Sequence, residues 1–286
     1  MSYRIITDTC CDFPSDVYAE LNISAVALKL DFQGKTVSEY PDAFLKEFFT
    51  GMRNGATGQT SAANPEDWKA VMEPWLQKDQ DLLVLVFSSG LSTTYQSAVI
   101  AAEELRESYP GRTIHVVDTL CASRGQGLLV WYACKKRDEG MSLDELTAWC
   151  EENKLHLCHW VAVNDLMHLK RGGRVSAATA VAGTLLQIKP IIHVDNEGHL
   201  INVGKVRGRK ASIEALADKM SKTAIPGAND TVFICHGDCM EDAQYLASLV
   251  KERCGVKEVV IYYVGAVIGA HTGPDVLALF FLGEQR

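Results

Sequence analysis

Four short segments of the sequence carry polar side chains that could hold an anionic oxygen. Small hydroxyls and the backbone N–H groups of a helix N-terminus favour a carboxylate or phosphate, and guanidinium forks bind either group. All four segments fall at the ends of predicted strands, where open α/β sheets bind their ligands. They are Thr60-Ser61, the hydroxyl-rich residues 88–94 (SSGLSTT), the basic turn 171–174 (RGGR) and residues 269–275 (GAHTGPD).

Each segment by itself also has a structural explanation. Serines after a strand often cap a helix, and a basic turn is often only a solvated loop. A lone histidine such as His271 more often holds a loop by hydrogen bonds, and Thr60-Ser61 could be a polar loop that leads into a helix. The functional interpretation therefore depends on the combination, because a cleft beside a sheet would bring all four segments together.

The familiar enzyme signatures are incomplete in this sequence. Residues 90–94 begin like a nucleophile elbow, but Thr94 replaces its last glycine, and no phosphate-binding P-loop or G-x-G-x-x-G motif is present. Cys235 and Cys239 flank His236, yet a single C-x3-C without a second pair supports zinc only weakly. We therefore expect no metal and no cofactor. An acyl hydrolase or acyltransferase that uses Ser92 with His271 stays open as the alternative function.

Short apolar runs alternate with helical patterns along the chain, which is typical of an α/β fold. Asn64 and Ser142 are predicted helix caps, and the second begins an S-x-x-E capping box. The predicted strands are 3–7, 24–32, 81–87, 113–118, 155–163, 189–195, 199–206, 231–237, 258–264 and 276–283. The predicted helices are 41–53, 65–76, 95–105, 123–137, 143–153, 177–187, 209–223 and 240–254.

The length of 286 residues is more than one core usually organises, so we expect two α/β lobes, 1–156 and 157–286. No long linker separates them, which favours a ligand held in a cleft between the lobes. The formal net charge of −8 argues against nucleic acid as a partner. No apolar run is long enough for stable membrane insertion. Nine irregularly spaced cysteines and a start unlike a signal peptide indicate a cytoplasmic protein.

Seven motifs, in their order along the chain, resemble the DegV family of bacterial fatty-acid-binding proteins. The resemblance covers essentially the whole chain. It implies a DegV-like pair of α/β lobes with a tunnel for a long-chain fatty acid such as palmitate, stearate or oleate. It also implies a carrier without catalysis of its own, which serves a separate fatty acid kinase in phospholipid synthesis. The motifs are IITDTCCD (5–12), Thr60-Ser61, SSGLSTTYQSA (88–98), VVDTLCASRGQG (116–127), LKRGGRV (169–175), KPI (189–191) and GAHTGPDVLALFF (269–281).

The resemblance also implies roles for individual residues of this chain. Thr60 and Ser92, with their neighbours Ser61 and Thr93, would bind the fatty-acid carboxylate. A second group would lie near the carboxylate or on the surface that faces the kinase: Arg171, Arg174, Arg207, His271, Thr272 and Gly273. The sequence departs from the family pattern at Thr93 and Asp275, which stand where glycine is usual, and at Ala62-Ala63.

Overall fold

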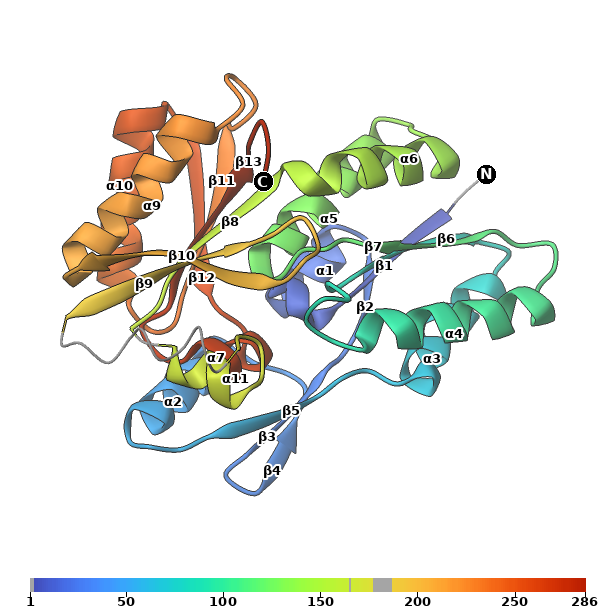
Figure 1. Ribbon diagram of the computed structural model, residues 1–286. Helices are drawn as coiled ribbons and strands as arrows, with labels where there is room; N and C mark the ends of the chain where they lie inside the picture. The colour runs from blue at the N-terminus through green and yellow to red at the C-terminus, as the bar shows by residue number, and fades with distance from the viewer. Residues whose placement is uncertain (1–2, 165, 177–186) are drawn as a thin grey trace.

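Three β-sheets organise the part of the chain that the computed structural model describes, residues 3–164, 166–176 and 187–286 (Figure 1). Two of these sheets are large and carry most of the helices on their faces. The third is small and lies beside the short helices at the bottom of Figure 1. The helix predicted at 177–187 falls almost entirely outside the described residues.

The first sheet is entirely parallel and has four strands. Its order is β2 (Ser24–Val26), β1 (Tyr3–Asp8), β6 (Asp81–Val86) and β7 (Ile114–Asp118). Every residue of β6 is buried, as its continuous apolar sequence predicts. One face packs against α3 (Pro65–Leu76) and α4 (Thr94–Ser108), and the other against α5 (Ser123–Asp138) and α6 (Leu143–Asn153).

Both predicted helix caps are confirmed. The Asn64 side chain accepts a hydrogen bond from the backbone N–H of Asp67, and Ser142 does the same for Glu145, with reciprocal side-chain bonds in each case. A cap of this kind stabilises a helix by roughly 1 kcal/mol, because it satisfies N–H groups that have no partner inside the helix. Local sequence therefore determined where α3 and α6 begin.

The second sheet is mixed and has six strands. Its order is β10 (Leu200–Arg207), β9 (Ile188–Val194), β8 (Leu157–Ala162), β13 (Leu277–Leu282), β11 (Thr231–His236) and β12 (Glu258–Tyr263). Only β11 and β12 run parallel; the other neighbours are antiparallel. One face packs against α9 (Arg209–Thr223) and α10 (Met240–Cys254), which lie along the outer side of the sheet in Figure 1.

The third sheet corrects two expectations. The predicted strand 24–32 is two strands, because β2 pairs with β1 whereas β3 (Lys29–Phe32) pairs with the hairpin strand β4 (Lys35–Val37) and with β5 (Gly58–Ser61). Thr60 and Ser61, expected in a loop, therefore belong to a strand. Sequence patterns do not show a change of pairing partner inside one apolar run. Helix α2 (Asp42–Arg53) follows β4 and buries Phe48 and Phe49.

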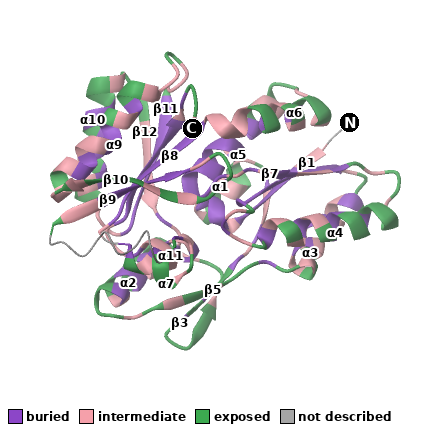
Figure 2. Cartoon of the chain, in the orientation of Figure 1, coloured by how far each residue is buried: buried purple, intermediate pink, exposed green. Residues whose placement is uncertain are grey.

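Within the described ranges, one apolar core connects the two large sheets. Its residues are among those drawn in purple in Figure 2, which marks all buried residues. Alternate residues of β8 and β13 separate into two sets: Val161, Ala278 and Phe280 belong to this central core, while their neighbours pack beneath α9 and α10. Helix α5 lies between the sheets and is buried on nearly every side. The lobe boundary at 156/157 stays a prediction; it falls between β7 of the first sheet and β8 of the second.

No helix in the described ranges is both long enough and apolar enough to cross a membrane.

Candidate functional site

A cavity of about 500 Å³ lies between the inner face of the second sheet and the loops and strands opposite it. Such a volume is in the range that small-molecule sites usually have. The sheet contributes a nearly continuous apolar wall: Val161 and Val163, Ile192 and Val194, and Val276, Ala278 and Phe280. The opposite side comes from residues 60–62, the loop after β6, the start of α5 and the short helix α11 (Ala266–Thr272).

Most of the predicted site residues meet at this cavity. Its lining includes Thr60, Ser61, Ser92, Thr93, Arg174, His271 and Thr272. The structure does not bring Arg171, Arg207 or Gly273 into the lining: Arg171 ends α7 (Met167–Arg171), Arg207 is the exposed last residue of β10, and Gly273 follows α11. The cavity thus has one polar end beside a long apolar wall.

Thr60 and His271 form a polar pair at this end. The Thr60 hydroxyl oxygen Oγ1 lies 2.8 Å from His271 Nε2, within hydrogen-bond distance. The antiparallel pairing of Leu30 with Thr60 fixes the position of Thr60 in β5. His271 lies in the last turn of α11, where a loop was predicted. Its other ring nitrogen faces Gly172, a position where a Cβ atom would collide with the ring.

His271 is neutral at physiological pH. Burial lowers its pKa from 6.5 to about 4, and the positive charge of Arg174 adds to this shift. A neutral imidazole has one N–H donor and one acceptor nitrogen, so it can either donate to Thr60 or accept from it. The pair therefore provides a directed hydrogen bond without a permanent charge on the histidine.

Acidification should destabilise the ligand-free protein through His271. Because its pKa is 6.5 in the reference state and about 4 in the fold, the unfolded chain binds more protons between these values, and stability falls as the pH decreases across that window. The variant His271→Gln has no titrating group at this position, so it should not lose this stability as the pH decreases. We expect the difference in unfolding free energy between wild type and variant to shrink on going from about pH 7 to about pH 5. Urea unfolding measures this difference; a constant value would contradict a buried, neutral His271.

Ser92 and Arg174 form the rest of the polar end. The Ser92 hydroxyl lies 2.8 Å from the Thr94 hydroxyl and accepts a hydrogen bond from the Thr94 backbone N–H at 3.2 Å. Arg174 donates from Nε to the Leu91 carbonyl at 3.2 Å and from Nη1 to the Gly172 carbonyl at 2.5 Å. These bonds hold the guanidinium group at the cavity, so a fixed positive charge lies beside the hydroxyls.

The contacts do not form the nucleophile–base pair that the alternative function requires. In the described part of the chain, Ser92 is bonded to Thr94 and His271 Nε2 to Thr60, with no hydrogen bond between Ser92 and His271. A serine nucleophile needs a base within hydrogen-bond distance. The structure therefore gives the acyl hydrolase or acyltransferase alternative no specific support.

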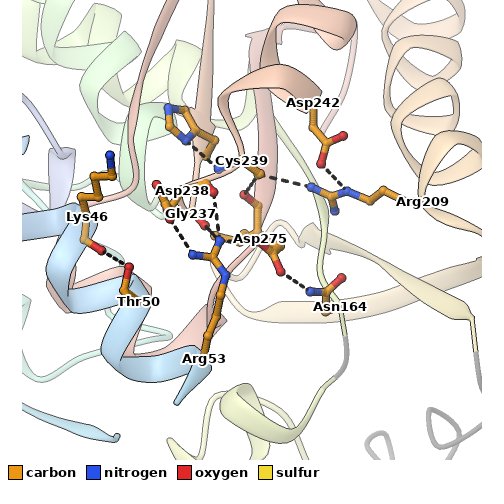
Figure 3. A network of polar contacts seen from close by, with 12 residues as sticks. Lys46, Thr50, Arg53, Asn164, Arg209, Gly237, Asp238, Cys239, Asp242 and Asp275 are labelled. Carbon is orange, nitrogen blue, oxygen red and sulfur yellow. Dashed lines mark hydrogen bonds and ion pairs between the residues drawn. The ribbon is translucent and has the colours of Figure 1, made fainter. Parts of the chain in front are cut away.

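Thr93 and Asp275, which stand where the family usually has glycine, both fit the backbone conformations at their positions. Thr93 has φ −74°, which any residue adopts. Asp275 has φ +60° and uses its carboxylate to hold that conformation: Oδ1 accepts from Arg53 Nη2 at 2.5 Å, and Oδ2 accepts from Asn164 Nδ2 at 2.8 Å (Figure 3). Arg53 also bonds Asp238 at 2.5 Å. This network ties α2 to the loop that follows His271.

Local hydrogen bonds and an ion pair hold the cysteine–histidine segment 235–239 in place. His236 Nδ1 accepts a hydrogen bond from the Cys239 backbone N–H at 3.2 Å, and Asp238 is engaged by Arg53. Burial raises the pKa of both Cys235 and Cys239 to about 12, so the free thiols stay protonated. Within the residues that the structure describes, neither cysteine belongs to a group of three potential ligands within reach of one ion. Among the described residues, Asp195, Glu197 and His199 do lie within reach of one ion. Glu197 and His199 are exposed, and Asp195 Oδ1 already accepts hydrogen bonds from the backbone N–H groups of both, as in an ordinary turn.

Known proteins similar to this chain identify its family. A sequence model described as "Uncharacterised protein, DegV family" matches residues 2–284. The chain belongs to the DegV family. A DegV domain-containing protein from Clostridium perfringens is 42% identical over 286 residues, which cover 99% of this chain and 98% of that protein.

Solved DegV structures have the same fold. A fatty-acid-binding DegV family protein from Thermus thermophilus is 31% identical and superimposes with a TM-score of 0.87, covering 99% of this chain and 100% of that one. A DegV lipid-binding protein from Thermotoga maritima is 28% identical with a TM-score of 0.87, and the match covers both chains completely. The fold is therefore the mixed α/β fold of DegV proteins, and fatty-acid binding is described for members of this family.

The sequence did not reveal the apolar residues of the site. Val161, Ala278 and Phe280 are ordinary inward-facing strand residues in the sequence pattern, and only the cavity distinguishes them from packed core. His159 also lines the cavity, with both ring nitrogens engaged: Nε2 accepts from the Ala122 N–H at 3.1 Å, and Nδ1 lies 2.8 Å from the Leu157 carbonyl. No signal in the sequence separates such a histidine from a structural one.

Proposed function

We propose that this DegV protein binds a long-chain fatty acid, with the carboxylate at the Thr60–Ser92 end of the cavity and the tail along the second sheet. The observation that supports it is the polarity of one cavity: hydroxyls, a neutral histidine and an arginine at one end, and apolar strand residues along the wall. Relatives described as binding fatty acids share the fold over the full chain.

The apolar tail would supply most of the affinity. A palmitate-class chain has on the order of 14 methylenes, which at about 0.8 kcal/mol each give roughly 11 kcal/mol before the costs of ordering. The polar end would then mainly orient the ligand. Neutral hydroxyls can hold a carboxylate without the desolvation penalty of a fully buried ion pair.

Thr60 and Ser92 can both donate to the carboxylate if their neighbours supply the hydrogen bonds they accept. When His271 carries its proton on Nε2, it donates to Thr60 Oγ1 and leaves the threonine O–H for the ligand. Likewise, Thr94 can donate to Ser92 Oγ through its backbone N–H or its hydroxyl, leaving the serine O–H for the ligand. Arg174 would balance the negative charge, and Ser61, Thr93 and Thr272 would border the carboxylate.

We further propose that the protein presents the carboxylate to a separate fatty acid kinase in the cytoplasm and has no catalytic activity of its own. The exposed cations Arg171 and Arg207 lie outside the cavity, on surfaces that a partner could contact. Charge that develops during phosphoryl transfer would be stabilised by Arg174 at the polar end. The two lobes 1–156 and 157–286 would enclose the ligand between them, and Gly273 would end α11 just after the turn that carries His271.

Native mass spectrometry with organic extraction tests the binding step. We expect the purified protein to carry a fatty acid, or to take up palmitate or oleate when it is supplied. Protein that neither carries nor binds any fatty acid would refute the proposal. Incubation with ATP and a fatty acid kinase then tests the partnership, by formation of acyl phosphate. Hydrolysis of an acyl ester by the protein alone, abolished by Ser92→Ala, would instead establish the enzyme alternative.

A further inference from the structure

The direction of the cavity follows from the strands in its wall. β13 begins a few residues after His271, so its start lies near the polar end. The side chains of Val276, Ala278 and Phe280 face the cavity in turn along this segment. At about 3.3 Å per residue, they lead roughly 13 Å away from the polar end.

The far end of this wall is closed by the rings of Phe280 and His159 and by the start of α5. Phe280 is paired with His159 across β13 and β8, and their rings meet edge to face at 5.4 Å. The start of α5 covers His159: the Ala122 N–H bonds its ring, and Gly125 packs directly against it. An acyl chain that follows the wall would therefore stop at Phe280 and His159.

The smallest side chain along this part of the wall is that of Ala278. Ala278 lies between Val276 and Phe280 along the chain, and it pairs with Val161 on β8 and with Cys235 on β11. Ala278 is buried and borders the cavity, so its methyl group faces the space that a ligand would fill. A larger side chain here would project across the route from the polar end to Phe280.

We infer that Ala278 determines the length of acyl chain that the protein accepts, because its small side chain lets a long chain pass to the closed end at Phe280 and His159. This inference rests on the proposed function. It makes preference for long chains a property of one residue in the wall, separate from the groups that hold the carboxylate.

Competition binding of laurate and palmitate to the full chain tests this inference. Ala278→Leu should lower the affinity for palmitate relative to laurate by roughly tenfold or more, as expected when a few methylenes no longer fit. Phe280→Leu should shift the ratio toward the longer chain. Ala62→Leu is the matched control, because Ala62 lines the cavity beside Thr60 and Ser61 at the polar end. It should leave the ratio unchanged.

The outcomes separate this inference from the proposed function. An unchanged palmitate-to-laurate ratio in folded Ala278→Leu, or the same shift in Ala62→Leu, would overturn the inference while fatty-acid binding stands. Failure of the wild type to bind either acid would refute the proposed function and the inference together. If Ala278→Leu does not fold, as judged by circular dichroism and thermal melting, Ala278→Val makes the same test with a smaller intrusion.

Discussion

Replacing Thr60 with valine should lower the affinity for a long-chain fatty acid by about tenfold to a hundredfold, because a buried hydrogen bond to a charged partner is lost. Valine has nearly the shape of threonine but no hydroxyl. The carboxylate would lose one donor, and His271 Nε2, now 2.8 Å from the Thr60 hydroxyl, would lose its partner. Isothermal titration with palmitate measures the effect.

Thr147→Val is the matched control for this experiment. Thr147 lies in α6, outside the cavity lining, and its hydroxyl donates to the Leu143 carbonyl at 2.8 Å. We expect this variant to bind palmitate with an affinity close to that of the wild type. Equal affinities for wild type and Thr60→Val would show that the carboxylate lies elsewhere, and the proposed orientation of the ligand would be wrong.

Gly125→Ala should destabilise the fold by about 1–3 kcal/mol, although alanine normally favours a helix over glycine by up to about 1 kcal/mol. Gly125 lies in the first turn of α5, and a Cβ atom there would collide with the imidazole of His159. His159 is bonded at both ring nitrogens, to the Ala122 N–H and to the Leu157 carbonyl, so its ring cannot move away from a new Cβ atom without losing these hydrogen bonds. Either these bonds break or the helix must shift.

Denaturant unfolding of Gly125→Ala and Gly204→Ala provides the comparison. Gly204 lies on the exposed edge strand β10, and an added Cβ atom would meet nothing within 4 Å. Its substitution should change the unfolding free energy by no more than about 0.5 kcal/mol. A Gly125→Ala protein as stable as the wild type would contradict the close packing of α5 against β8, which also closes the far end of the cavity.

Elements with strong local signals were predictable from the sequence. The caps at Asn64 and Ser142, the buried strand β6 and the strands of the second sheet lie where the pattern placed them, within a few residues. Caps depend on hydrogen bonds between residues three positions apart, and strand burial depends on the apolar pattern itself. Neither needs information from distant parts of the chain.

Elements whose identity depends on distant partners were missed. Thr60 lies in a strand because Leu30 pairs with it, and the run 24–32 divides because its halves join different sheets. Arg124 is the clearest case. This arginine of α5 is fully buried, and its guanidinium carbon lies 4.0 Å from the ring centre of Tyr262 and 4.6 Å from that of Phe13. A charged residue inside a helix gives no sign of such an aromatic environment.

The sequence by itself determined the α/β class, the family and the residue types of the polar end, because these depend on local patterns and ordered motifs. Only the tertiary structure decided how those residues combine. Thr60 and His271, which are 211 positions apart, meet at 2.8 Å, whereas Arg171 and Arg207 lie outside the cavity. Only the tertiary structure also showed which apolar residues form the wall of the cavity. An inward-facing valine or alanine gives the same sequence pattern whether it packs against a neighbour or borders a cavity. The packing of the two sheets and α5 decides which of the two occurs.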